Sequence, residues 1–308
     1  MDNQVSICIL MTSYNGEKFI RQQLESIFSQ TFKNWQLIIS DDGSTDKTKE
    51  IILEYQKILG GKIQLRNGPQ NGFAENFLSL ACDKNLVSDF YAFCDQDDVW
   101  LPQKLEVAIK QISNASLNNE PYLYCGCTVY VDEQLIAIGQ STLFKQPPSF
   151  DNALVQSIAG GNTMIFNRAS KLVIETVGMV PTPSHDWWLY LLISGAGGKV
   201  FYDRTPLLLY RQHGNSIVGE NTSFFNKFKR LLKLVDGGFK KWTDSNIKCL
   251  QMAEDLLTHK AKESLSILIN IRQLSFFKKI KNMKLFRYYR QSSFQNLILK
   301  IAFLMNKI

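Results

Sequence analysis

The first hundred residues alternate short apolar runs with segments of helical periodicity, and this alternation most constrains the fold. Residues 5–11 form a nearly continuous apolar run, as expected for a strand buried on both faces. Residues 17–30 follow with apolar side chains at helical spacing. The same criteria predict strands at 35–40, 62–66, 90–94, 122–131, 161–167, 200–203 and 207–210, and helices at 46–59, 74–81 and 185–193. This order predicts an α/β fold whose sheet is mostly parallel and covered by helices on both faces.

Polar residues follow three of the expected strands. Thr12 to Gly16 come after the first strand, Asp41 to Ser44 after the second, and Asp95 to Asp98 after the fourth. Parallel sheets bind their ligands at the carboxyl ends of the strands. The sequence therefore predicts a site for a polar ligand at this edge.

The segment from Asp95 to Asp98 holds three carboxylates in four residues. Carboxylates this close repel one another unless a cation or strong donors offset their charge. Oxygen ligands suit Mg²⁺ or Mn²⁺, and such an ion is typically held by one or two carboxylates together with substrate phosphates. The segment favours metal and phosphate binding. The alternative is a solvated turn in which Asp98 caps the next helix.

Three further motifs each have a functional and a structural interpretation. Asp41 and Asp42 can accept hydrogen bonds from a ribose or a base, or can form an Asx-turn and a helix cap. Asp186 begins an apolar helix beside bulky aromatics, where a partly desolvated carboxylate can act as a general base or as an N-cap. His213 is one of three histidines, and it is either a metal ligand or a filler side chain.

Charge is unevenly distributed along the chain. Residues 224–308 hold 18 Lys and Arg against 5 Asp and Glu, a net of +13, whereas residues 1–223 hold 17 against 23, a net of −6. This asymmetry predicts a boundary near residue 224 and an anionic partner for the tail. Basic amphipathic stretches at 224–234 and 274–289 favour a membrane interface. Nucleic acid fits less well, because the sequence has no recognised motif for it. Packing of the apolar faces on the body is the third alternative.

Length and composition exclude several classes of protein. A chain of 308 residues suggests two domains, or one large α/β domain with an appendage. With 45% apolar and 20% charged residues, it is not a disordered, collagen-like or coiled-coil chain. Six scattered cysteines without a C-x-x-C pair argue against a disulfide framework or a zinc site and favour a reducing compartment. We expect neither a signal peptide nor a membrane-spanning segment.

Several motifs occur together and in order along the chain. They are Ser6-Ile7, Thr12-Ser13-Tyr14-Asn15, Gln30-Thr31, Asp41-Asp42-Gly43-Ser44-Thr45-Asp46, Asn71, Asp95-x-Asp97-Asp98 and His185-Asp186. Over residues 4–216 this set resembles the inverting nucleotide-sugar glycosyltransferases of family 2. The phrase from Phe93 to Trp100 is most similar to bacterial rhamnosyltransferase-type members that build surface polysaccharides.

The resemblance implies a GT-A glycosyltransferase domain at 1–223 and a basic helical region at 224–308. It implies nucleotide-sugar contacts from Thr12, Tyr14, Asn15, Asp42, Asn71, Asp95 and Gln96. It further implies that Asp95, Asp97 and His213 hold Mn²⁺ or Mg²⁺ and that Asp186 is the catalytic base. Relatives often have Glu before that Asp, so His185 departs from the commonest pattern.

The implied activity is metal-dependent, inverting transfer of a sugar from dTDP-rhamnose or a UDP-hexose to a lipid-linked glycan. This would serve O-antigen or capsule synthesis, with the enzyme peripheral on the cytoplasmic face of the cell membrane and without a nucleic-acid partner. One alternative is a non-catalytic nucleotide-sugar or glycan-binding module, which would have no use for a base. Another is a nucleotidyltransferase, which would usually have a Gly-rich basic loop where this chain has residues 11–18.

Overall fold

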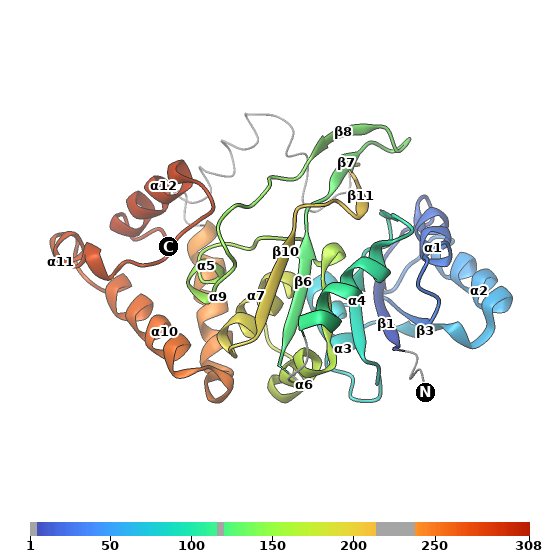
Figure 1. Cartoon of the computed structure of the whole chain (residues 1–308), viewed down its shortest axis with the longest axis horizontal. Coiled ribbons are helices and arrows are strands. Elements are labelled where there is room, and N and C mark those ends of the chain that lie inside the picture. Colours follow the sequence, from blue (N-terminus) through green and yellow to red (C-terminus); the bar gives the residue numbers. More distant parts are fainter. Residues whose placement is uncertain (1–4, 116–119, 214–237) are drawn as a thin grey trace.

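The computed structural model describes residues 5–115, 120–213 and 238–308, and its centre is a seven-stranded sheet (Figure 1). The strands are β1 (Ile7–Ser13), β2 (Trp35–Asp41), β3 (Ile63–Asn67), β4 (Phe90–Cys94), β6 (Tyr122–Gly126), β9 (Ile165–Asn167) and β10 (Lys199–Asp203). Their order is β10-β6-β9-β4-β1-β2-β3. Every neighbouring pair is parallel except those of β9, which runs antiparallel to β4 and β6. The prediction of an α/β fold with a mostly parallel sheet is confirmed.

A smaller sheet lies above the upper ends of the central strands in the view of Figure 1. Its strands are β5 (Val99–Trp100), β7 (Val129–Val131), β8 (Ala137–Gln140) and β11 (Leu208–Arg211), in the order β5-β11-β7-β8. The expectation of one strand over 122–131 is wrong, because the chain leaves the central sheet after Gly126 and enters the smaller sheet at Val129. Apolar residues continue through this break, so their pattern does not reveal the change of sheet.

The expected strand at 161–167 is also shorter than predicted. Its first half is a 3-10 turn, Gly161–Thr163, and only Ile165–Asn167 is paired, in the antiparallel direction. The turn matters for the site because it brings the backbone of Gly161 to the start of a buried helix, as described below.

Helices cover the two faces of the central sheet. The cluster on one face includes residues of α1 (Ile20–Phe28), α2 (Thr48–Leu59) and α4 (Lys104–Ala115). The cluster on the other face includes residues of α3 (Phe73–Ala81), α5 (Phe150–Ala153), α6 (Arg168–Val177) and α7 (His185–Gly195). Along β1, Cys8 and Leu10 join the α7 side whereas Ile7, Ile9 and Met11 join the α1 side. This is the two-residue period of a strand buried on both faces.

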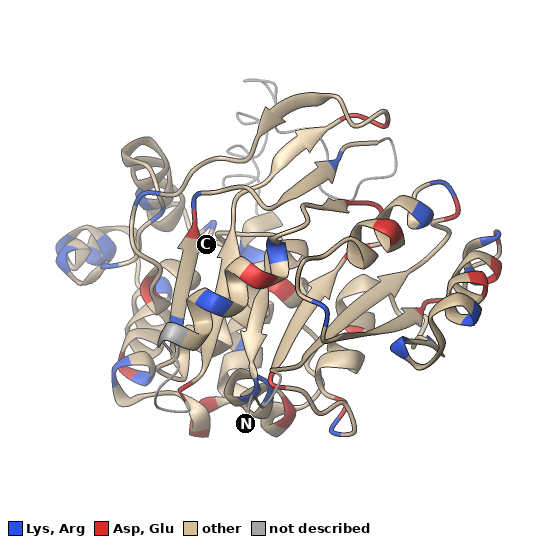
Figure 2. Cartoon of the chain, turned by 45° about the vertical axis from the view of Figure 1, so that its right-hand side comes forward, with Lys and Arg blue, Asp and Glu red and all other residues tan. Residues whose placement is uncertain are grey.

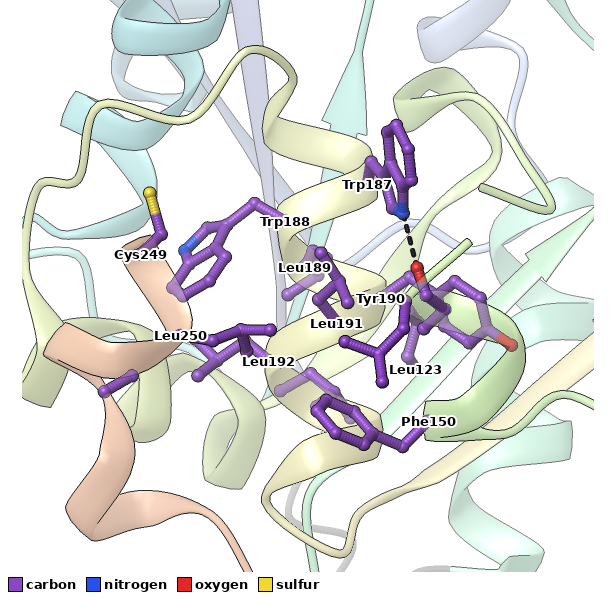
Figure 3. Packing of buried hydrophobic residues seen from close by; sticks show 14 of the residues in the cluster. Leu123, Phe150, Trp187, Trp188, Leu189, Tyr190, Leu191, Leu192, Cys249 and Leu250 are labelled. Atoms are coloured by element: carbon purple, nitrogen blue, oxygen red, sulfur yellow. Dashed lines mark hydrogen bonds between the residues drawn. The ribbon is translucent and has the colours of Figure 1, made fainter. Parts of the chain in front are cut away.

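Helix α7 is buried around nearly its whole circumference (Figure 3). Trp188, Leu191 and Leu192 have no exposed surface. The ring of Trp187 is almost fully buried. Its indole Nε1 donates a 2.7 Å hydrogen bond to the carbonyl of Ala153, and this bond fixes the orientation of the ring. A helix that is apolar on all sides has to be covered on all sides, and the sheet alone covers only one.

The C-terminal helices supply that cover. They are α9 (Gly238–Met252), α10 (His259–Arg272), α11 (Phe276–Lys281) and α12 (Ser293–Leu304). Leu250, Leu268 and Phe303 belong to the same hydrophobic cluster as Trp188. The described part of the C-terminal region therefore packs on the body, the third of the alternatives weighed for the tail.

The details of the tail differ from the expectation. The expectation that the amphipathic stretch 274–289 forms one helix is wrong. Helix α11 ends at Lys281, and a 3-10 turn, Met283–Leu285, leads from there to the buried rings of Phe286 and Tyr288. Those two rings make the segment turn inward. The stretch 224–234 and the boundary near 224 lie outside the described residues. Among the helices of the described ranges, none has both the length and the apolar character needed to cross a bilayer.

Candidate active site

The carboxyl ends of β1, β2 and β4 are neighbours, so the three polar segments lie at one edge of the sheet. Ser13 is in register with Asp41, and Met11 is in register with Cys94. Thr12 is the second-to-last residue of β1 and is buried. The expectation that the polar ends of these strands meet at one edge is confirmed.

Asp41 is a buried carboxylate that organises the turn after β2. It accepts a 2.8 Å hydrogen bond from the hydroxyl of Ser13 and another of 2.8 Å from the backbone N–H of Ser44, and the ammonium of Lys49 lies 3.2 Å away. Burial opposes ionisation, but the hydrogen bonds from Ser44 and Ser13 outweigh it and lower the pKa of Asp41.

Asp42 holds the loop that follows β3. Its two carboxylate oxygens accept hydrogen bonds from the backbone N–H of Gln70, at 2.7 Å, and of Gly72, at 3.1 Å. Asn71 lies between these two donors, and its exposed amide donates to Glu75 at 3.0 Å. Asp42 thus positions the backbone on either side of Asn71, and the two residues lie close together as the resemblance implies.

The segment after β1 is fixed by both neighbouring turns. Asn15 adopts a left-handed backbone (φ 46°), its N–H donates to the Ser44 hydroxyl at 2.9 Å and its side-chain oxygen accepts from the N–H of Thr45 at 2.9 Å. The Gln96 side chain exchanges two hydrogen bonds of 2.9 Å with the backbone of Tyr14. The Tyr14 side chain is left 58% exposed at this edge, where it can contact a ligand.

Asp97 and His213 meet across the site. Asp97 Oδ2 lies 2.8 Å from Nε2 of His213, which follows β11 and packs 4.9 Å from the ring of Phe19. Burial, together with the negative charges of Asp97 and Asp186, raises the pKa of Asp95 to about 7. The carboxylates of Asp97 and Asp186 are therefore close enough to that of Asp95 to interact with it electrostatically.

Asp186 occupies the first turn of α7, directly after its first residue. Ser184 is at the N-cap position, so the N-cap interpretation of Asp186 is wrong. The carboxylate accepts hydrogen bonds from the N–H of Trp187, at 2.6 Å, from the N–H of Gly161, at 3.2 Å, and from the Ser184 hydroxyl. These three donors hold the carboxylate in one orientation at the start of the helix.

His185 points away from that carboxylate into the core. Its ring stacks on Phe77 at 3.9 Å and meets the edge of Phe93 at 4.9 Å. Burial lowers the pKa of His185 to about 4, so the ring is neutral at pH 7. Within the described ranges neither of its nitrogens has a hydrogen-bond partner.

Sequence reasoning assigned no role to the side chain that ties the acidic segment together. Arg211 is completely buried at the end of β11, its Nε donates to the carbonyl of Asp97 at 2.9 Å and its backbone N–H donates to Asp98 at 3.2 Å. Asp98 is buried too and accepts 2.6 Å from Asn162, so it is a structural carboxylate rather than an exposed helix cap. A charged residue that directly follows an apolar strand was the signal for Arg211.

Lys104 contributes a second buried cation near the acidic segment. Its ammonium lies 3.7 Å from the ring centre of Trp100 and donates to the carbonyl of Asn162. Burial lowers the pKa of Lys104 to about 7, although the nearby carboxylates of Asp98 and Asp95 act against this. Arg211 and Lys104 therefore compensate the inner part of the cluster.

The residues expected to hold a metal offer oxygen and nitrogen donors. Within residues 5–115, 120–213 and 238–308, no three His, Cys, Asp or Glu side chains are preassembled as a metal site. Asp97 and His213 nonetheless form an oxygen and nitrogen pair, and burial together with nearby negative charge raises the pKa of Asp95 beside them. Two carboxylates and a neutral imidazole suit Mn²⁺ or Mg²⁺, with phosphate oxygens completing the coordination. The donor set fits the ion.

The fold of this chain is similar to that of solved structures that contain nucleotide sugars. The chain superposes on S. aureus TarS 1-349 in complex with UDP-GlcNAc with a TM-score of 0.55 and 13% identity, covering 98% of this chain and 90% of that one. It also superposes on the mannosyltransferase PcManGT from Pyrobaculum calidifontis, solved with GDP-Man and Mn²⁺, with a TM-score of 0.51 and 14% identity, covering 98% and 86%. At these identities the likeness establishes the GT-A fold.

Sequence comparison establishes the family. A relative from Shigella flexneri, the dTDP-rhamnosyl transferase RfbG, is 32% identical over 72% of this chain and 78% of its own length. The Escherichia coli protein WfgD, a UDP-Glc:alpha-D-GlcNAc-diphosphoundecaprenol beta-1,3-glucosyltransferase, is 35% identical over 38% of this chain and 44% of its own. The sequence model described as "Glycosyl transferase family 2" matches residues 8–169, a range that ends before Asp186 and His213. The chain belongs to glycosyl transferase family 2 and is a glycosyltransferase.

Proposed function

We propose that this enzyme transfers rhamnose from dTDP-rhamnose to a lipid-linked glycan, with inversion and with the help of a divalent cation. The observation that carries the proposal is the convergence of Asp95, Asp97, His213 and Asp186 at one edge of the sheet. A metal-binding set and a carboxylate beside it that can act as a base are the two requirements of a single displacement at a sugar. A module that only binds the nucleotide sugar would need the first and not the second.

Asp186 is the proposed base. Its carboxylate accepts the proton of the acceptor hydroxyl as that oxygen attacks the anomeric carbon, and the bond from this carbon to the nucleoside diphosphate breaks on the opposite face. The N–H groups of Trp187 and Gly161 orient the carboxylate for this step. Positive charge develops on the sugar ring, as in glycoside hydrolysis. Asp95, Asp97 and His213 would hold the divalent cation, which would offset the negative charge that develops on the departing diphosphate.

The choice of donor and acceptor is supported by the relatives. The Shigella flexneri relative is a dTDP-rhamnosyl transferase by name, and the Escherichia coli relative has a diphosphoundecaprenol-linked acceptor in its name. A lipid-linked acceptor agrees with the net charge of +13 in residues 224–308, which favours a position at an anionic membrane face. A UDP-hexose is the second candidate donor, because the Escherichia coli relative has UDP-Glc in its name.

The donor is tested by calorimetric titration of dTDP and of UDP, each with and without Mn²⁺. We expect dTDP to bind more tightly than UDP, and only when Mn²⁺ is present. An Asp97→Ala variant is the matched control and should lose the dependence on the metal. A preference for UDP would replace rhamnose by a hexose, and no binding of either nucleotide would contradict the proposed transfer.

The base is tested by an Asp186→Asn variant. We expect its kcat to fall by about 10²–10⁴-fold, the usual contribution of a general base, with dTDP binding unchanged. Radiolabelled transfer to a lipid-linked acceptor measures kcat, and calorimetry measures binding. Full turnover in this variant would exclude Asp186 as the base.

A further inference from the structure

Helix α12 has two apolar sides, and only one of them is covered. Leu299 and Phe303 face the core and are buried. On the opposite side Phe294 is 61% exposed, Leu297 56% and Ile301 43%. An apolar side of this size on an ordinary soluble helix would be expected to have a partner.

Helix α11 lies against α12 and has exposed apolar side chains of its own. The ammonium of Lys279 is buried and donates to the carbonyl of Phe303 at 2.8 Å and to Asn306 at 2.6 Å, which ties the two helices together. On α11, Phe277 is 78% exposed and Ile280 49%. We call the combined set the C-terminal surface; its members are Phe277, Ile280, Phe294, Leu297, Ile301 and Met305.

In the part of the chain that forms the C-terminal surface, all of the charged residues are basic. Residues 264–308 contain nine Lys and Arg and no Asp or Glu. Exposed lysines at 278, 281, 284 and 300 are interleaved in sequence with the apolar side chains. The blue segments of these outer helices are visible at the left edge of Figure 2. The occupant of this surface therefore has to be both apolar and negatively charged.

We propose that the C-terminal surface docks on a bilayer that contains anionic phospholipid. Phe, Leu and Ile would enter the boundary between head groups and acyl chains, while the surrounding lysines would contact lipid phosphates. A second copy of this chain fits poorly, because two such surfaces would bring their lysines together. The docking gives the lipid-linked acceptor of the proposed function its location, and vesicle binding itself does not depend on that function.

The position of the surface is compatible with an enzyme that works while docked. In Figure 1, α11 and α12 lie at one end of the molecule, and α1 and α2 lie at the other. Docking would therefore leave the nucleotide-binding ends of β1 and β2 uncovered. Removal of residues 224–308 would expose the core around Trp188, so substitutions on the surface are the sharper test.

The apolar part is tested by co-sedimentation of the full chain with vesicles of phosphatidylcholine and phosphatidylglycerol. A Phe277→Ser, Leu297→Ser, Ile301→Ser variant should bind at least about tenfold more weakly, because it removes apolar area from the interface. The matched control is Leu53→Ser, Ile58→Ser, Val87→Ser, three apolar side chains elsewhere on the protein that are 44%, 75% and 66% exposed, respectively. The control should bind like the unaltered protein.

The charged part is tested by a variant with Lys278, Lys281, Lys284 and Lys300 changed to Gln. Each lysine near an anionic surface contributes about fivefold, the equivalent of about 1 kcal/mol, so the variant should lose more than about 100-fold on anionic vesicles. It should bind pure phosphatidylcholine vesicles as weakly as the unaltered protein does. The matched control changes four exposed lysines far from α11 and α12, at positions 47, 57, 84 and 110.

The proposal is overturned if the unaltered protein ignores anionic vesicles, or if either variant binds them as well as its control. It is also overturned if the protein forms a dimer that the serine variant dissociates, as measured by sedimentation velocity, or if a DNA oligonucleotide competes the protein off the vesicles. Titration of dTDP with Mn²⁺ into the serine variant separates the two proposals. Normal nucleotide binding with lost vesicle binding supports docking, and failed nucleotide binding in the unaltered protein contradicts the proposed transfer alone.

Discussion

Two acidic turns lie at the same edge of the sheet, and their carboxylates have opposite surroundings. In the turn after β2, Asp41 is surrounded by donors and its pKa is lowered. In the turn after β4, the pKa of Asp95 is raised to about 7, and no hydrogen bond to its carboxylate occurs in the described part of the chain. The first turn is completed by the protein's own donors. The second turn retains negative charge that the protein does not neutralise. A cation that is also bound to a diphosphate would neutralise it.

The difference predicts that the two turns respond oppositely to the loss of a charge. Asp97→Asn should lower kcat/KM for the donor by at least about 100-fold, because it removes a ligand from the charge-stabilising centre. The free energy of unfolding should change by less than about 0.5 kcal/mol, because substitutions that leave packing intact usually have small effects. Steady-state kinetics and urea unfolding of the same preparation measure both quantities. A large loss of stability with intact activity would remove the distinction between the turns.

Asp41→Asn should show the reverse behaviour. The buried carboxylate accepts hydrogen bonds from Ser13 and Ser44, and hydrogen bonds to a charged group contribute about 1.5–3 kcal/mol each. We expect the free energy of unfolding to fall by about 2–3 kcal/mol, measured in urea at pH 7, with kcat nearly unchanged at a temperature where the variant is folded. The exposed Asp255→Asn is a suitable control. Equal stability of the Asp41 variant and the control would refute the structural role.

The pH dependence sharpens the same point. Because the pKa of Asp41 is lower in the folded protein than its ordinary value of 3.8, its contribution to stability is present above about pH 4 and is lost as the pH falls through the folded pKa. The difference in unfolding free energy between the unaltered protein and Asp41→Asn should therefore be constant above about pH 5 and shrink as the pH falls below about 4. Urea unfolding at a series of pH values measures it. A constant difference would mean that the charge of Asp41 is not what stabilises the turn.

The smallest effect is expected at Asp42, which is part of the completed turn and also a proposed nucleotide contact. Asp42→Asn loses one acceptor for the N–H of Gln70 or Gly72, so stability should fall by about 1 kcal/mol. The KM for the donor should rise by about tenfold while kcat stays within a factor of about two, because Asp42 is a proposed nucleotide contact and takes no part in the proposed proton transfer. If kcat falls instead, Asp42 acts on the chemical step and the two turns are less distinct than proposed.

Much of the site's layout could be predicted from the sequence, because the order of strands and the polar residues after them are local features. The buried run before Asp95 and the helical pattern after it are enough to place that residue at a carboxyl end. The meeting of Asp97 with His213, 116 residues apart, was inferred from the resemblance and not from any local pattern. The structure brings these two side chains together.

What could not be predicted depends on contacts between distant residues. Arg211 and Asn162 compensate Asp98 because β11 and the turn at Gly161 return to the same place, and no periodic pattern records this. The two acidic turns look alike in sequence, and only the donors from Ser13 and Ser44 distinguish Asp41. The prediction that the basic tail is helical is confirmed for its described part. Its helices also contribute buried side chains to the hydrophobic core.

The enclosure of α7 between the sheet and α9 has a consequence for exchange of parts among related enzymes. Trp188 and Leu250 share one cluster, and Asp186 stands at the start of the helix that carries Trp188. A chimera joined near residue 224 would pair one protein's α7 with another protein's α9, so mismatched volumes would tilt the helix that carries the carboxylate. Chimeras that keep the activity should therefore take α7 and the C-terminal helices from the same parent protein.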